Sequence, residues 1–103
     1  MNKIFYHKIN KDIDRSGLDS LILSSGEKKR AGAFKFQKDF NLYVFGKLLT
    51  RRTLASLFDL NPEKIKFKID KYDRPFLDHP KIKNFDFNLS HSGKYVVLAI
   101  SDT

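Results

Sequence analysis

The residues of this chain best suited to chemistry lie in the segment FNLSHSG, residues 87–93. An alternating stretch runs into Ser90, His91, Ser92 and Gly93, which predicts that these four residues form the loop of a hairpin. Such a loop presents successive backbone N–H groups, two hydroxyls and an imidazole to one point, and Gly93 is free to adopt a positive φ. The segment therefore has the donors of a phosphate site, where a histidine would retain its proton and add a charge-assisted hydrogen bond.

The same four residues also have a plainer interpretation. Ser90 and Ser92 are typical of local turn hydrogen bonds, and His91 then lies on the surface without a ligand. From the residues of the turn alone, this second interpretation is the favoured one, so the choice depends on the rest of the chain.

Three segments have the pattern of strands in one sheet. Residues 4–9 mix β-branched and aromatic types and predict a first strand at a sheet edge. Residues 85–89 alternate and predict a second strand, while residues 94–101 are apolar almost throughout, which is typical of a central strand. The hairpin is therefore expected to carry SHSG at its tip.

A further strand is predicted over residues 64–70, KIKFKID, where apolar and charged residues alternate. Ile65, Phe67 and Ile69 are expected to face a core. Residues 71–80 are rich in turn formers and predict an irregular connection.

One long helix is predicted over residues 38–58, which contain no proline. One of its faces is apolar and consists of Phe40, Val44, Leu48, Ala55 and Phe58. Four more apolar residues lie outside that stripe, so other elements of the domain or another chain must cover them: Leu42, Phe45, Leu49 and Leu57.

Shorter helical segments are predicted upstream of the long helix. One covers residues 18–23, and a second is capped by Ser24 or Ser25 with Glu27 in its first turn. The long helix should end before Pro62, because the residue preceding a proline avoids the helical region. Together these elements predict an α+β fold, an antiparallel sheet packed against one long helix.

Composition sets the class of protein and of partner. The 103 residues include 10 phenylalanines and 41% hydrophobic residues, which predicts one globular domain over residues 1–103. The sequence contains no cysteine, so disulfides and thiolate zinc sites are excluded. The N-terminal residues do not resemble a signal peptide and no apolar run is long enough for a membrane span, so a soluble cytoplasmic protein is expected. A net charge of +8 favours anionic partners.

Three segments, in this order, make the chain similar to the N-terminal half of the Sfp-type 4′-phosphopantetheinyl transferases. Residues 27–54 resemble the family's basic segment, its aromatic-x-aromatic-x-x-Asp pattern and its long helix with an internal glycine. Residues 67–77, FKIDKYDRPFL, resemble a strand followed by the family's Gly-Lys-Pro turn. Residues 85–101 match the Phe-Asn-x-Ser-His-Ser-Gly hairpin closely, and this last motif is the most specific.

The resemblance implies a fold and an activity. Enzymes of this family are pseudo-dimers of two similar α+β halves, and this chain resembles the N-terminal subdomain. They transfer the phosphopantetheine arm of coenzyme A to a serine of an acyl or peptidyl carrier protein, use Mg²⁺, and release adenosine 3′,5′-bisphosphate. The resemblance thus predicts a transferase of the holo-acyl-carrier-protein synthase type.

Family positions carry over to particular residues. Ser90 and His91, with Ser92 beside them, correspond to contacts with the 3′-phosphate of coenzyme A. Arg74 and Pro75 correspond to the turn beside the adenine. Arg30 and Lys28 correspond to the basic residues that meet the nucleotide phosphates, and these types suit a phosphate ligand.

The chain also departs from the family pattern. Leu42 stands where the family commonly has an arginine, and Asp73 replaces the glycine before the basic residue, which predicts weaker binding of coenzyme A. The sequence given ends at Thr103, before the family's Asp-x-Glu metal ligands, and Asp102 is not expected to replace them. We therefore expect no metal site and no catalytic residue here, and a truncated chain that is inactive alone.

Two consequences concern partners. An isolated half is expected to self-associate as a homodimer or to pair with a missing C-terminal half. The alternative class is a small basic nucleic-acid-binding module, in which Lys64, Lys66 and Lys68 would follow a phosphate backbone. The sequence has no nucleic-acid-binding motif, so a nucleic-acid partner is not expected.

Overall fold

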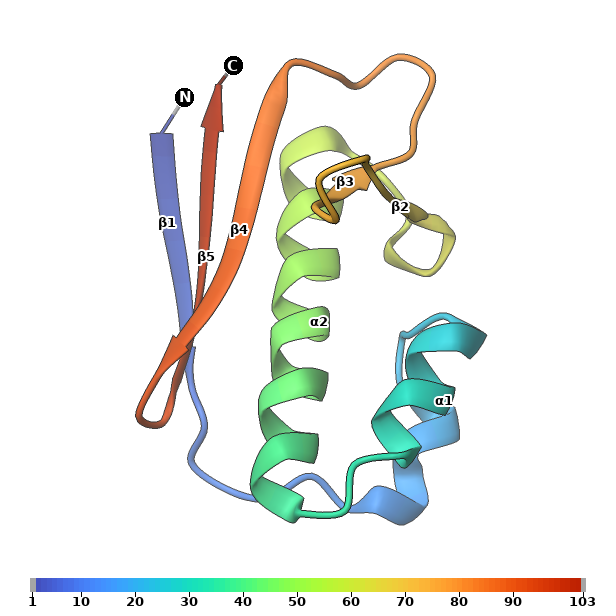
Figure 1. Cartoon of the computed structure of the whole chain (residues 1–103), viewed down its shortest axis with the longest axis vertical. Coiled ribbons are helices and arrows are strands. Elements are labelled where there is room, and N and C mark those ends of the chain that lie inside the picture. Colours follow the sequence, from blue (N-terminus) through green and yellow to red (C-terminus); the bar gives the residue numbers. More distant parts are fainter. Residues whose placement is uncertain (1, 103) are drawn as a thin grey trace.

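The computed structural model describes residues 2–102, which form a three-stranded antiparallel sheet, a long helix and a small second ribbon (Figure 1). The elements in chain order are β1 (Asn2–Lys8), η1 (Arg15–Ser20), α1 (Ser25–Gly32), α2 (Gln37–Phe58), η2 (Pro62–Lys64), β2 (Phe67–Ile69), β3 (Pro75–Leu77), β4 (Phe85–Ser92) and β5 (Tyr95–Asp102). The predicted α+β class with an antiparallel sheet is confirmed.

The sheet has the strand order β1-β5-β4, so β5 is central and β1 lies at an edge, as predicted. Leu98 of β5 is fully buried and is paired with Phe5 of β1 and Leu89 of β4. Because side chains alternate along a strand, Val96 and Ile100 share the Leu98 face, which packs against α2. The alternating and apolar segments of the sequence therefore gave the right strands at the right sheet positions.

Helix α2 lies between two groups of packed side chains. On the sheet side, Leu54 and Ala55 join Leu98 in one core. On the opposite side, Phe40 and Val44 form a second core with residues of α1 and of the segment before it. Figure 1 shows this arrangement, with the sheet on one side of α2 and α1 with the β2–β3 ribbon on the other.

The domain's own elements cover most of the apolar residues outside the predicted stripe of α2. Leu49 and Leu57 pack against the core on the sheet side. Phe45 stacks on His7 of β1 with a centroid separation of 4.8 Å. The excess apolar width of α2 is thus explained within this domain, and it provides no argument for a second chain.

Both helices begin or end through identifiable caps. The Ser24 hydroxyl accepts the backbone N–H of Glu27, whose carboxylate accepts the backbone N–H of Ser24, a capping box at the start of α1. Helix α2 ends at Phe58 because Asp59 adopts a left-handed conformation with φ of 54°. The predicted serine cap and helix stop are confirmed.

The prediction of a half-buried strand over residues 64–70 was largely wrong. Only Phe67–Ile69 forms a strand, and it pairs with β3 of the expected turn region, outside the main sheet. Ile65 is buried, but Ile69 is 64% exposed. A two-stranded ribbon this short has too little partner surface to bury every alternate side chain, so alternation alone misplaced Ile69.

Across residues 2–102, no helix combines the length and the apolar character that crossing a bilayer requires.

Candidate functional site

The Ser90–Gly93 segment folds differently from the predicted loop. Strand β4 continues through Ser92, and the two-residue turn consists of Gly93 and Lys94, with Gly93 at φ of 57°. His91 pairs with Val96, so its side chain lies on the α2 face of the sheet, whereas Ser90 and Ser92 lie on the other face. The hairpin prediction was right and the loop boundaries were wrong. The four residues therefore do not converge on one point.

His91 nevertheless lines a cavity between β4 and the start of α2, which we call the His91 cavity. Its volume is about 280 Å³, and its lining includes Phe34, Asp39, Tyr43 and Ser90. Ser92 does not belong to this lining. The cavity combines an imidazole, a hydroxyl, a phenol and two aromatic walls, but it also contains one carboxylate.

Arg30 lies beside this cavity. Its guanidinium carbon is 6.0 Å from the ring centroids of both Phe34 and Tyr43, two of the residues that line the His91 cavity. The Arg30 side chain is exposed, so it is free to turn toward a ligand. Arg30 therefore borders the aromatic wall of the His91 cavity from α1 without lining the cavity, and it is about 60 residues from His91 in sequence.

Lys28 has a different place. Its Nζ donates to the backbone carbonyl of Asp19 at 2.7 Å, which ties α1 to the end of η1. Lys28 lines neither this cavity nor the larger one described next.

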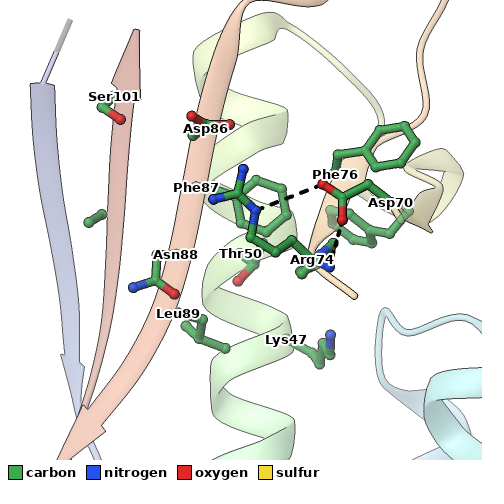
Figure 2. Close-up of a pocket in the computed structure, with 13 residues that line it drawn as sticks. Lys47, Thr50, Asp70, Arg74, Phe76, Asp86, Phe87, Asn88, Leu89 and Ser101 are labelled. Atoms are coloured by element: carbon green, nitrogen blue, oxygen red, sulfur yellow. Dashed lines mark hydrogen bonds and ion pairs between the residues drawn. The ribbon is translucent and has the colours of Figure 1, made fainter. Parts of the chain in front are cut away.

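A larger cavity of about 580 Å³, the Arg74 cavity, lies between the β2–β3 ribbon, α2 and β4. Arg74 and Pro75 come from the ribbon, Lys47 and Thr50 from α2, and Leu89 from β4 (Figure 2). Leu89 also lines the His91 cavity. The two cavities therefore adjoin along the space between α2 and β4.

A tight turn holds Arg74 at this cavity. The Asp70 carboxylate accepts the backbone N–H groups of Arg74 and Tyr72, both at 2.9 Å. The hydrogen bond from the Arg74 backbone is the main cause that lowers the pKa of Asp70 below its ordinary value. The Arg74 side chain is 69% exposed and makes only a 3.8 Å contact with Asp70, so its guanidinium is available to an anion.

Sequence reasoning missed a group of charges on the neighbouring face of α2. Burial lowers the pKa of Lys47; Glu27 raises this pKa in turn, and Arg51 and Arg30 lower it further. Burial also raises the pKa of the Tyr43 phenol. Tyr43, Lys47 and Arg51 recur every four residues, and this spacing on one helix face was the signal that could have revealed them.

The remaining histidines and acids have other roles. His79 accepts two backbone N–H groups through Nδ1 and so organises a turn, as expected. Asp39 lies in the first turn of α2, also as expected. Among residues 2–102, no three His, Asp or Glu side chains are grouped as a metal site requires.

Comparison with known sequences agrees with this fold. The family described as "4'-phosphopantetheinyl transferase, N-terminal" matches residues 17–103. A phosphopantetheinyl transferase of Thraustochytrium is 34% identical over 76 residues, 74% of this chain and 26% of the relative. A 4′-phosphopantetheinyl transferase of Aneurinibacillus migulanus is 30% identical over 104 residues, 99% of this chain and 42% of the relative.

A mammalian relative is also similar to this chain. The L-aminoadipate-semialdehyde dehydrogenase-phosphopantetheinyl transferase of Rattus norvegicus is 33% identical over 76 residues, 71% of this chain and 25% of the relative. This chain thus spans between a quarter and about two fifths of these relatives. Its antiparallel sheet and helices form an α+β domain, which is consistent with the N-terminal domain of the phosphopantetheinyl transferase class. The chain belongs to the 4′-phosphopantetheinyl transferase family, and it matches the N-terminal part of that family.

Proposed function

We propose that this domain binds the adenosine bisphosphate end of coenzyme A for a 4′-phosphopantetheinyl transferase. The observation that carries the proposal is the cavity where His91 and Ser90 of β4 lie beside Arg30 of α1, next to a second cavity lined by Arg74 and Pro75. Two adjoining cavities with cations in or beside each suit a ligand with a base and more than one phosphate.

Within this proposal each residue has a chemical task. His91 donates a hydrogen bond to the 3′-phosphate, and the Arg30 guanidinium turns from its aromatic neighbours to the same group. The Arg74–Pro75 turn offers backbone groups and a cation beside the adenine. Lys28 supports α1 through its bond to Asp19, and the hydroxyls of Ser90 and Ser92 lie on the opposite face of the sheet, so none of the three side chains is assigned a direct contact.

The metal of the family is a separate question. Mg²⁺ prefers oxygen ligands and is usually held by one or two carboxylates together with substrate phosphate. The part of the chain that the structure describes has no group of acidic residues that fits this requirement. We therefore assign no catalytic step to a metal here, and the proposal gives this domain binding of the nucleotide without catalysis of transfer.

The sheet face turned away from α2 fits the proposed role as part of a larger assembly. Ile4 and Tyr6 of β1 are 71% and 69% exposed on that face, and the ring of Tyr95 of β5 contacts that of Tyr6 edge to face, with a centroid separation of 5.9 Å. Exposed apolar residues gathered on one face are typical of a contact surface. A second half of the transferase or a second copy would cover it, with the carrier protein as the acceptor and the cytoplasm as the compartment.

Calorimetric titration with coenzyme A, adenosine 3′,5′-bisphosphate and 3′-dephospho-coenzyme A tests the binding proposal. The first two ligands should bind, and removal of the 3′-phosphate should weaken binding about tenfold or more. His91→Ala should reduce this preference, whereas His79→Asn, which keeps an acceptor for its turn, should leave it unchanged. Equal binding of coenzyme A and its 3′-dephospho form, or no binding by the unmodified chain, would overturn the proposal.

A further inference from the structure

Lys47 lies on α2 at the Arg74 cavity, one helical turn from a residue of the His91 cavity. It lines the Arg74 cavity, and Tyr43, one turn earlier, lines the His91 cavity. The Lys47 ammonium lies 5.6 Å from the ring centroid of Tyr43 and 5.9 Å from that of Phe67. Figure 2 shows Lys47 on α2 on the same side of the sheet as Arg74 of the ribbon. A half-buried cation is thus held between two aromatic rings at the Arg74 cavity.

Three charged side chains act on Lys47, and the carboxylates of Asp70 and Asp86 line the same cavity. Arg51 and Arg30 both lie close enough to act on it, and Glu27 is the one carboxylate that does so. Glu27 is already paired with Arg51, at 2.8 Å. Within residues 2–102, the two ring contacts are the interactions that the Lys47 ammonium makes, and no carboxylate or carbonyl accepts a hydrogen bond from it.

Packing alone does not explain a lysine at this position. The aliphatic part of the side chain could fill the same space as methionine, without a charge to desolvate. The Lys47 ammonium reaches the Arg74 cavity and is not sealed from solvent, since no buried side-chain nitrogen of residues 2–102 lacks a partner. A phosphate oxygen that enters this cavity would give the ammonium a charge-assisted acceptor, which is stronger than a neutral one.

We propose that Lys47 is an anion-binding residue of the Arg74 cavity. Its ammonium would donate a hydrogen bond to the 5′-phosphate of a nucleotide whose 3′-phosphate occupies the His91 cavity. This inference rests on the proposed function for the identity of the nucleotide. Tyr43 and Lys47 are one helical turn apart, about 6 Å along the axis, so one ligand bearing two phosphates on a single ribose can reach both cavities.

The first experiment compares adenosine 3′,5′-bisphosphate with adenosine 3′-monophosphate by calorimetry. Lys47→Met should weaken binding of the bisphosphate about tenfold and leave binding of the monophosphate nearly unchanged. Lys64→Met is the matched control, since Lys64 is exposed at the end of η2 and lines neither cavity. Unchanged binding of both nucleotides, or equal losses for both, overturns the assignment of Lys47 to the 5′-phosphate.

A second experiment separates this inference from the proposed function. The unmodified chain is treated with an amine-acylating reagent, with and without inorganic pyrophosphate, and labelling of each lysine is measured by mass spectrometry. Pyrophosphate should protect Lys47 but not Lys64. If the chain binds no nucleotide, the proposed function fails, while selective protection of Lys47 still supports an anion site. Absence of protection in that case overturns this inference too.

Discussion

The Arg51 guanidinium donates from Nε to Oε1 of Glu27 at 2.8 Å, and the same carboxylate oxygen accepts the backbone N–H of Ser24 at 2.8 Å. Arg51 also donates from one terminal nitrogen to the carbonyls of Pro62 and Ile65. One buried side chain, 2% exposed, thus joins α2 to the cap of α1 and to the chain that enters the ribbon. Both cavities depend on this junction, because their lining residues come from the elements it connects.

Arg51→Met should therefore destabilise the domain by about 3 kcal/mol, because it leaves a mostly buried carboxylate and two carbonyls without their donor. Urea denaturation of the variant measures this change in the free energy of unfolding. Glu27→Gln keeps an acceptor and should cost about 1–2 kcal/mol. The double variant Glu27→Gln, Arg51→Met should cost less than the sum of the two, and strict additivity would contradict the coupling.

Gly46→Ala tests the close approach of α2 to β4. An added Cβ would lie 2.7 Å from Cδ2 of Leu89, so the leucine must move or the helix must shift. We expect a net loss of about 1 kcal/mol, since overpacking outweighs the gain in helix propensity. In a Leu89→Ala background the same change should become stabilising. Thermal denaturation of the unmodified chain, the two single variants and the double variant measures both effects.

Lys47 should make the folded chain less stable at neutral pH. Its pKa is lowered in the folded state from an ordinary value of 10.5, so the unfolded chain binds more protons between the two pKa values and stability rises with pH across that window. Lys47→Met should be more stable than the unmodified chain at pH 7, and the gap should shrink as the pH approaches 10.5. Denaturation at several pH values measures the gap, and Lys64→Met should show none.

Asp39 should oppose a phosphate in the His91 cavity that it helps to line. As an acid in the first turn of α2 it favours the helix, so Asp39→Asn should lower stability by about 0.5 kcal/mol. The same change should tighten binding of adenosine 3′,5′-bisphosphate several-fold, because it removes a like charge. Weaker binding by the variant would show that the carboxylate supports the site, for example by holding His91 in place.

Periodicity and cap chemistry predicted the helix, its ends and the strand order, because these features depend on neighbouring residues. The length of β4 escaped prediction, since Ser90, His91 and Ser92 suit a turn by type and pair with β5 only because the partner strand extends as far. No pattern in the sequence singled out Lys47. Its significance comes from Phe67, which approaches from a segment 20 residues later.

The sequence predicted which types of residue the candidate site would contain, but it did not predict how those residues are arranged in space. Arg30 and Arg74 were predicted from family resemblance, yet the place of Arg30 beside one cavity and of Arg74 in the wall of the other follows from how α1 and the ribbon dock on α2. Docking of that kind rests on tertiary contacts such as those of Arg51, and no local pattern encodes it.

The two-residue turn at Gly93 and Lys94 also fixes the face of the sheet on which His91 lies, because side chains alternate between the two faces along β4. Inserting one residue between His91 and Gly93 would carry His91 to the face away from α2 if the turn and the pairing with β5 were kept. An insertion of two residues would restore the face. Relatives of this hairpin that keep a working imidazole are thus expected to differ by even numbers in the count of residues between the histidine and the turn.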